Sequence, residues 1–320
     1  MSWRLRCRRG CEAMKSLDRL PDLPGIICRQ PDKSGHYTTL GIGGHVAMSV
    51  QAFTPSALIA ALRILKSEEI AHVVIGGGSN TVFPEQAPEL VLVVNRTRGI
   101  RRVAADRIAV QSGESTLNVM AWCASSGVAG LEFLAGIPGS MGGAVVVNAG
   151  AFGRDMSACF IQAQSLDSKG NEASIQPAEC SFQYRDSALK RGESVLMEIT
   201  LAVEPSDPEV VRQRIRRNFE YRRKNHPGRG SRTAGCFFKN PGRDKAGSAG
   251  RLIDSAGLRG LRRSGLEISS QHANFISNRG GARMTDLQAF VQHIITVVMQ
   301  KHGVRLEREV LFVTPDGKWY

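Results

Sequence analysis

The chain of 320 residues is long enough for two or three domains with a proper core, and its 42% apolar and 22% charged residues are ordinary for a globular protein. No apolar stretch reaches the roughly 20 residues that cross a bilayer, which excludes insertion into a membrane. Seven cysteines without a Cys-x-x-Cys pair argue against a disulfide framework and against a metal site, and they favour the reducing cytoplasm. The net charge of +13 predicts an anionic partner, for which nucleic acid, a membrane surface and a phosphorylated small molecule all qualify.

The first third of the chain predicts a small parallel α/β unit behind a loose leader. Residues 1–34 are rich in arginine and proline and lack a secretory signal, and Met14 is an alternative start. Thr54 and Pro55 predict the beginning of a helix. Two strands with a glycine turn between them are expected over 38–50, and single strands at 72–75 and 89–95. This order of strand, helix and strand defines a unit over residues 35–98.

The middle third predicts an α+β unit with an antiparallel sheet over residues 99–205. A hairpin is expected over 100–110, followed by a helix over 116–126 that Gly127 ends. We expect this helix to bury Leu117, Met120, Ala121 and Ala124. Further strands are expected at 161–166, 171–175 and 194–203.

Two glycine-rich runs, VIGGGSNTVF at 74–83 and GIPGSMGGAVVVNAGAFG at 136–153, are too dense in glycine for an ordinary strand or helix. Each could be a tight turn, or the two could fold around a large cofactor that carries phosphates. The segment 76–80 follows a predicted strand, where consecutive backbone N–H groups can form an anion-binding concavity. Neither run matches a Walker loop or the G-x-G-x-x-G dinucleotide fingerprint.

The last third, residues 206–320, predicts a second α+β domain that starts at the Pro-rich boundary 204–208. Ser206 or Asp207 can cap the helix that follows. The arginine-rich run 212–232 could be a solvated helix face, an anion site for phosphates or a surface for nucleic acid. Thr285 and Gln288 predict a capping box for a long helix, and residues 306–313 a closing strand.

Seven motifs occur in one order: VIGGGSN, the segment GLEFLAGIPGSMGGAVVVNAGAFG, YRDS at 184–187, AGCFFKNP, AGRLIDSAGLRG, QHANFISN and LEREV at 306–310. This ordered set closely resembles the UDP-N-acetylenolpyruvoylglucosamine reductase family over residues 35–315, in its shorter type without an extra substrate loop. The resemblance implies an FAD-binding region of the vanillyl-alcohol-oxidase (PCMH) type, built from two α+β subdomains, and a substrate domain. It also implies NADPH-driven reduction of UDP-N-acetylglucosamine enolpyruvate in peptidoglycan precursor synthesis, by a cytoplasmic monomer or weak dimer that binds no nucleic acid.

The resemblance also implies the residues of the site. Arg185 would hold the carboxylate and offset the charge that develops beside it, and Glu309, rather than the nearby Glu307, would assist protonation. Cys236 stands where the family usually has its proton-donating serine. Non-covalent FAD would contact Gly76, Gly77, Gly78, Ser79, Asn80, Gly136, Ile137, Pro138, Gly139, Ser140, Gly143 and Asn148. The UDP-sugar or NADPH would contact Tyr184, Arg222, Lys239, Asn240 and His272.

Each catalytic candidate also has a purely structural interpretation. Arg185 could be a charge at a strand edge, Cys236 a buried inert residue and His272 a structural histidine. A thiol with a pKa of about 8.5 is nevertheless a much stronger acid than an alcohol, so Cys236 is a reasonable donor and is expected to be sensitive to oxidation or alkylation. The alternatives for the whole chain are another FAD oxidoreductase that acts on a hydroxy acid or alcohol, a basic nucleic-acid-binding protein, and an impaired paralogue.

Overall fold

A computed structural model describes residues 17–192, 194–228, 230–242 and 247–320. The first sheet contains β1 (Ile26–Arg29), β2 (Asp32–Lys33), β3 (His45–Ala52), β4 (His72–Ile75) and β6 (Gln86–Asn95). Its order is β1-β3-β6-β4, with β2 also on β3, and β6 is parallel to both β3 and β4. Helix α2 (Pro55–Ser67) joins β3 to β4, and its N-cap Thr54 accepts a hydrogen bond of 3.2 Å from the N–H of Ala57. The predicted parallel strands and helix are therefore confirmed, but the first of the two strands expected over 38–50 is wrong, because residues 38–44 form no strand.

The prediction of a loose leader is wrong for residues 17–34. Strand β1 pairs antiparallel with β3, and the side chain of Leu20 is completely buried beneath α2. Residues 1–16, including Met14, lie outside the described residues. A strand of four residues that buries alternate side chains only partly leaves little hydrophobic pattern, which is why the sequence did not reveal it.

The second sheet is antiparallel, as predicted, in the order β13 (Glu172–Ile175), β12 (Phe160–Leu166), β14 (Val195–Ala202), β8 (Arg107–Gln111) and β7 (Ile100–Ala104). Helices α3 (Thr116–Ser126) and α4 (Met141–Val146) contribute to the core beside this sheet. The predicted inner face of α3 is wrong by about one residue: Val119 and Cys123 are buried with Met120, whereas Leu117 is 53% exposed. The smaller elements here are β9 (Val128–Ala129), β10 (Gly150–Ala151), β11 (Arg154–Asp155), β15 (Glu204–Pro205), α5 (Pro177–Cys180), η3 (Glu132–Leu134), η4 (Met156–Ala158) and η5 (Ala188–Arg191).

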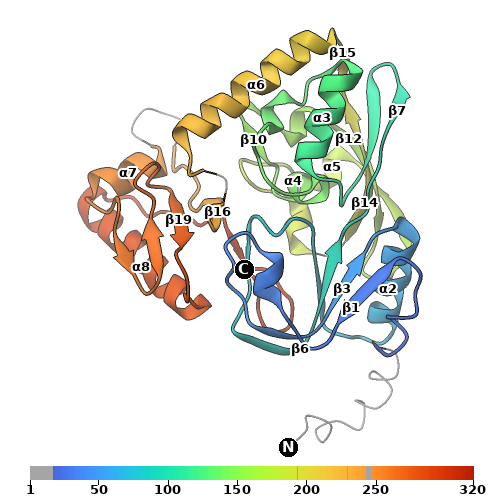
Figure 1. Ribbon diagram of the computed structural model, residues 1–320, viewed down its shortest axis with the longest axis horizontal. Coiled ribbons are helices and arrows are strands. Elements are labelled where there is room, and N and C mark those ends of the chain that lie inside the picture. Colours follow the sequence, from blue (N-terminus) through green and yellow to red (C-terminus); the bar gives the residue numbers. More distant parts are fainter. Residues whose placement is uncertain (1–16, 193, 229, 243–246) are drawn as a thin grey trace, which may run out of the picture.

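Helix α6 (Pro208–Asn225) connects the second sheet to the C-terminal lobe (Figure 1). Its N-cap is Asp207, whose side chain accepts bonds from the N–H groups of Glu209 and Val210. The buried Val211 and Ile215 belong to the core of the second sheet, although the sequence analysis placed this helix in the C-terminal domain.

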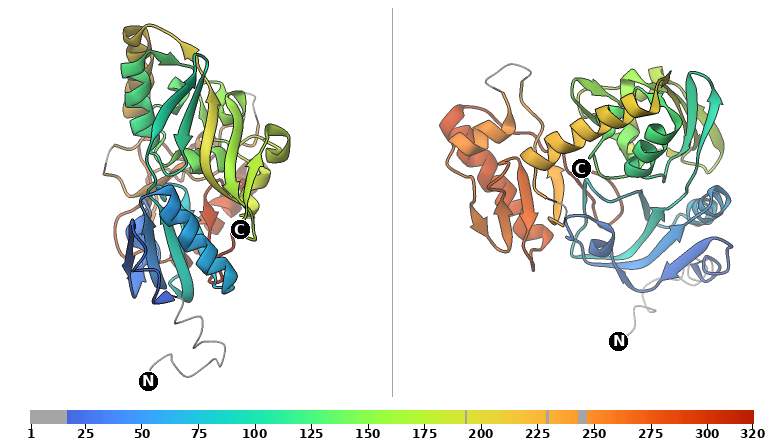
Figure 2. Two further views of the ribbon diagram at one scale, coloured as in Figure 1. Left: turned by 90° about the vertical axis from the view of Figure 1, so that its right-hand side faces the viewer. Right: turned by 45° about the horizontal axis from the view of Figure 1, so that its top comes forward.

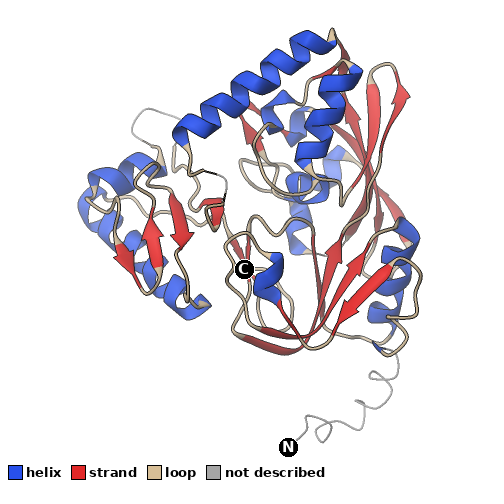
Figure 3. Cartoon of the chain, viewed as in Figure 1, coloured by secondary structure: helices blue, strands red, loops and turns tan. Residues whose placement is uncertain are grey.

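The third sheet is also antiparallel, in the order β16 (Thr233–Cys236), β19 (Phe275–Asn278), β18 (Leu266–Ile268) and β17 (Arg262–Arg263). Helices α7 (Ala249–Ser255) and α8 (Met284–His302) pack beside it, as Figure 3 shows. The predicted capping box of α8 is wrong, because Arg283 and Asp286 form it and Thr285 instead bonds to Glu85.

The chain then returns to the lobe built on the first sheet, so that the C-terminus lies between this lobe and the C-terminal lobe built on the third sheet (Figure 2). Strand β20 (Leu311–Phe312) pairs in parallel with β5 (Thr81–Val82), which follows the first glycine run. It is shorter than the predicted strand over 306–313. Around it, Val82 joins the core of the C-terminal lobe and Val313 joins that of the first sheet. The remaining short element is η2 (Ser34–Tyr37). Among the described helices, none is long and apolar enough to cross a membrane.

Candidate active site

The two glycine runs lie directly against each other, the first after the edge strand β4 and the second around helix α4. A Cβ atom on Gly76 would lie 1.9 Å from Ser140 Oγ, and one on Gly77 would lie 2.7 Å from Gly139 Cα. The hydroxyl of Ser79 donates a hydrogen bond of 2.9 Å to the carbonyl of Pro138. Only glycine allows these segments to approach so closely, and this contact explains Gly76, Gly77 and Gly139.

The second run is not wholly irregular, although the sequence analysis judged its glycine content too high for a helix. It includes the short helix α4, whose N-cap Ser140 accepts a bond of 3.3 Å from the N–H of Gly143. Gly142 packs against Ser112, where a Cβ would lie 3.0 Å from the serine Cβ. The glycine content thus permits close packing of a helix as well as turns.

The cradle formed by the two runs is suited to a large cofactor. Gly76, Gly77, Gly78 and Gly139 leave no room for a Cβ, so the backbones of the two runs pack closely against each other and against their neighbours. Asn148 has a left-handed φ of 46°. Its side chain donates to the carbonyl of Gln183 at 2.8 Å and accepts from the N–H of Ser157 at 3.0 Å. Asn148 therefore shapes the cradle, with both ends of its side chain bonded to the protein.

Arg185 lies in a tight turn that the second glycine run holds in place. The turn is closed by two backbone bonds between Gln183 and Asp186, and Arg185 has a left-handed φ of 55°. The guanidinium donates a 2.5 Å bond to the carbonyl of Gly150, and Lys190 Nζ donates a 2.6 Å bond to the Arg185 carbonyl. This backbone conformation is costly for a residue other than glycine, so the surrounding bonds must maintain it.

Glu309, which lies near the C-terminus, forms an ion pair with Arg185 in the middle of the chain. Arg185 Nε lies 3.3 Å from Glu309 Oε1, and both side chains are largely buried. Asn80, at the end of the first glycine run, donates its amide to the Glu309 carbonyl at 3.1 Å. Burial raises the pKa of the Glu309 carboxyl, against the opposing effect of the charges on Arg185, Lys190 and Lys239. The structure also separates Glu309 from Glu307, because the Glu307 side chain is 71% exposed and pairs with Lys239.

Cys236 ends β16 close to this pair, and its environment corrects the expectation of an acidic thiol. Burial, together with the charge of Glu309, raises the thiol pKa to about 12, although Arg222, Arg185 and a hydrogen bond with Asn274 oppose the shift. A thiol with this pKa stays protonated at neutral pH and exposes little reactive thiolate. Cys236 can therefore serve as an acid, and its raised pKa argues against the predicted sensitivity to alkylation.

Arg222 stands apart from the other basic residues of α6. Arg212, Arg216 and Arg217 are exposed, as a solvated helix face requires. The stem of Arg222 packs instead against Gly136, where a Cβ would lie 2.6 Å from its Cδ, and its Cζ lies 5.8 Å from the centre of the Phe152 ring. Its Nε is buried and has no hydrogen-bond partner among the residues that the structure describes. The solvated helix face is thus confirmed for Arg212, Arg216 and Arg217, whereas an anion site at Arg222 stays a prediction.

A cavity of about 380 Å³ opens beside Arg185, and it contains three of the predicted substrate residues: Tyr184, Lys239 and Asn240. Tyr184 is 41% exposed, and the Arg185 guanidinium lies 5.2 Å above its ring. Lys239 Nζ lies 2.5 Å from Glu307 and 3.6 Å from Asp186. Burial favours its neutral form, but these two carboxylates outweigh burial and raise its pKa. Lys239 is thus a cation whose charge is already balanced.

His272 does not line this cavity. Its ring packs on His226 and Phe275, with ring centres 5.3 and 5.1 Å apart. Burial, with the charges of Arg222 and His272, lowers the pKa of His226 to about 4, so this ring is neutral. Sequence reasoning missed Asn274, whose amide bonds to both backbone groups of Phe238 beside Cys236. Its place within the motif QHANFISN was the only available signal.

Comparison with known proteins matches both parts of the chain. Residues 46–175 match the model of an FAD binding domain, and residues 226–313 match the model of the UDP-N-acetylenolpyruvoylglucosamine reductase C-terminal domain. The chain is 33% identical over 287 residues to the UDP-N-acetylenolpyruvoylglucosamine reductase of Bacillus subtilis (strain 168), covering 89% of this chain and 93% of that protein. It is 34% identical to that of Syntrophus aciditrophicus (strain SB), covering 88% and 90%. The crystal structure of the reductase from Thermus caldophilus superposes with a TM-score of 0.73 at 31% identity, over 90% of this chain and 98% of that one.

Proposed function

Because this chain belongs to the UDP-N-acetylenolpyruvoylglucosamine reductase family, we propose that it reduces UDP-N-acetylglucosamine enolpyruvate to UDP-N-acetylmuramate with NADPH, in the synthesis of peptidoglycan precursors. The observation that carries this proposal is the convergence of Arg185, Cys236 and Glu309 beside the two glycine runs. These residues come from the second lobe, the C-terminal lobe and the returning C-terminal segment. The same arrangement supports the predicted α+β fold of an FAD-binding region followed by a C-terminal domain.

When bound without a covalent bond, FAD would supply the hydride chemistry, with NADPH as the reductant. We assign its cradle to the backbone of 76–80 and 136–140, together with Gly143 and Asn148. The close packing of Gly76, Gly77 and Gly139, which brings the two runs together, supports this assignment. Consecutive backbone N–H groups in such a run could bind phosphates.

The chain's own residues then handle charge and protons. As hydride adds to one carbon of the enolpyruvyl double bond, negative charge moves toward the neighbouring carbon and its carboxylate. We propose that Arg185 binds that carboxylate and stabilises the developing charge. Cys236 then donates its proton to the neighbouring carbon, and its thiolate recovers a proton from solvent. Glu309 orients Arg185 and, with its raised pKa, assists the protonation.

The remaining substrate assignments follow from position. Tyr184, Lys239 and Asn240 line the cavity and would contact the UDP-sugar. Arg222, buried with an unpartnered nitrogen, would meet an anionic group of the substrate or NADPH. His272 stays the least supported of these assignments, because its contacts are with other rings. The five described cysteines are all free, which supports action in the reducing cytoplasm.

The decisive experiment measures NADPH oxidation by the purified, FAD-loaded protein with and without UDP-N-acetylglucosamine enolpyruvate. We expect oxidation that depends on the UDP-sugar and yields UDP-N-acetylmuramate, detected by mass spectrometry. Oxidation that ignores this substrate but responds to a hydroxy acid or alcohol would establish the alternative oxidoreductase. A Cys236→Ser variant that turns over when the natural chain does not would show that the cysteine impairs the reaction.

A further inference from the structure

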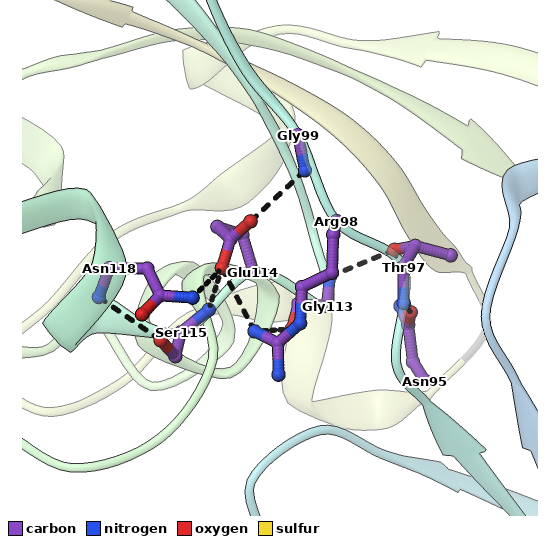
Figure 4. Close-up of polar contacts among 8 residues, drawn as sticks. All are labelled: Asn95, Thr97, Arg98, Gly99, Gly113, Glu114, Ser115 and Asn118. Atoms are coloured by element: carbon purple, nitrogen blue, oxygen red, sulfur yellow. Dashed lines mark hydrogen bonds and ion pairs between the residues drawn. The ribbon is translucent and has the colours of Figure 1, made fainter. Parts of the chain in front are cut away.

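A buried carboxylate lies at the junction of the first two lobes, away from the residues assigned to chemistry. The segment 95–99 links β6 of the first sheet to β7 of the second, and 112–116 links β8 to α3. Figure 4 shows the two segments side by side, with Glu114 between them. Glu114 is only 4% exposed, and a buried carboxylate requires compensation by hydrogen bonds or charge.

Four donors from both segments satisfy this carboxylate. From the linker, Arg98 Nη1 donates at 2.9 Å and the N–H of Gly99 at 3.0 Å. From the start of α3, the N–H of Ser115 and the amide of Asn118 each donate at 2.9 Å. These bonds outweigh the effect of burial and lower the pKa of Glu114, so it is ionised at neutral pH. One charged group thus joins the linker to the second lobe.

The backbone beneath Glu114 is packed as tightly as the glycine runs. A Cβ on Gly113 would lie 2.3 Å from Asn95 Oδ1, and the N–H of Gly113 donates to Thr97 Oγ1 at 3.2 Å. Asn95 also donates its amide to Ser112 Oγ at 2.8 Å. The junction therefore has little freedom to slide once the carboxylate is bonded.

The same segment holds the second glycine run through its backbone. The N–H of Met141 donates to the Glu114 carbonyl at 2.8 Å, and the N–H of Thr116 donates to the Gly139 carbonyl at 3.1 Å. Thr116 Oγ1 donates to the Ile137 carbonyl at 2.5 Å. The first glycine run follows β4, which pairs with β6, the strand that ends at Asn95. Both runs are thus attached to the two segments that Glu114 joins.

We propose that Glu114 is a positioning residue for FAD, because its carboxylate fixes the spacing between the two glycine runs that form the cofactor cradle. The inference rests on the FAD site of the proposed function and deepens it. The charge matters as well as the shape: a glutamine amide would direct its own NH₂ toward N–H donors and leave at least one of them unpaired. The cradle would then widen or shift without the loss of any residue that touches FAD.

The experiment compares Glu114→Gln with Glu267→Gln in the FAD-free and FAD-loaded proteins. Glu267 is the matched control, since it is also buried and is bonded by Arg262 at 3.1 Å and Arg279 at 2.9 Å, but lies in the C-terminal lobe. We expect Glu114→Gln to raise the FAD dissociation constant by about tenfold or more, the loss that one unpaired buried donor produces. We also expect a shift of the bound flavin's visible absorption bands. Glu267→Gln should leave the affinity and the spectrum unchanged, even where it lowers the melting temperature.

A half-exposed partner provides a milder test if Glu114→Gln does not fold. Arg98→Met should weaken FAD binding by about threefold, and Arg98→Lys should restore part of the affinity because it keeps the charge. Wild-type affinity and an unshifted flavin spectrum in a folded Glu114→Gln or Arg98→Met protein would overturn the proposal. FAD titration uses no UDP-sugar, so this outcome is independent of whether the chain reduces the proposed substrate.

Discussion

The unusual environment of Cys236 leads to a quantitative prediction about its reactivity. A shift of the thiol pKa from the ordinary 9.0 to about 12 lowers the thiolate fraction at pH 8 by about a thousandfold. A more basic thiolate is also a better nucleophile, which returns a factor of about 16 to 32 across this shift. We therefore expect Cys236 to react about 30 to 60 times more slowly than an unperturbed thiol with a small methyl thiosulfonate reagent, before any loss of access.

The assay is peptide-resolved mass spectrometry of samples quenched over time at pH 8, with the unfolded protein as the internal reference. Two variants should change the labelling rate of Cys236 in opposite directions, because Glu309 raises the thiol pKa and Arg222 lowers it. Glu309→Gln should speed the labelling of Cys236, and Arg222→Met should slow it. Labelling of the natural protein within about threefold of the unfolded reference would refute the reasoning, since it would require a thiolate population that burial does not allow.

Three further substitutions test the packing of the two glycine runs, the proposed role of Arg185 at the substrate carboxylate, and the hydrogen bonds of Asp32 near the N-terminus. Gly77→Ala places a Cβ 2.7 Å from Gly139 Cα, which should cost about 1 to 3 kcal/mol through overpacking. This cost should raise the FAD dissociation constant about 5- to 150-fold in a fluorescence titration. The control Gly228→Ala, whose Cβ would have nothing within 4 Å, should leave the constant unchanged. Arg185→Lys should lower kcat by about a hundredfold or more but leave FAD reduction by NADPH, followed by stopped flow, within about twofold. Asp32→Asn should lower the free energy of unfolding by about 1 to 3 kcal/mol at pH 7, since Asp32 accepts from Tyr37 and Ser49. Burial raises the pKa of Asp32, but its hydrogen bonds outweigh burial and lower that pKa. The stabilisation by Asp32 is therefore present above the unfolded pKa near 3.8 and is lost as pH falls below it. A difference in unfolding free energy, measured with urea, that grows toward pH 3 would contradict this prediction.

Features set by neighbouring residues could be predicted from the sequence. The helix start at Thr54 and Pro55 is confirmed, since capping depends on residues within one turn. The strand at 72–75 is confirmed at both ends. The buried face of α3 could not be predicted from periodicity, because its apolar residues lie on several sides of the helix. Only the packing of the whole fold decides that Leu117 faces solvent.

Features set by distant segments could not be predicted in this way. No local pattern shows that Glu309 returns to Asn80, or that Gly76 must be small because Ser140 faces it. The resemblance to a family supplied Arg185, Cys236 and Glu309 as a set, but it did not give the direction of the thiol pKa, which depends on burial by the whole fold. Glu114 was missed because nothing in the local pattern shows that the linker residues Arg98 and Gly99, 16 and 15 residues earlier in the chain, bond to its carboxylate.

The pairing of charges around the cavity explains how a strongly basic chain can keep a selective site. Arg185 is balanced by Glu309, and Lys239 by Glu307 and Asp186. Arg222 differs, because its buried Nε has no bond partner within the described part of the chain. An anionic substrate therefore meets cations that are already oriented by carboxylates, which limits reorganisation when it binds. The Arg222 guanidinium lies next to Cys236, where negative charge appears only after the thiol has given up its proton. Its position thus favours the state that follows proton transfer over the resting site.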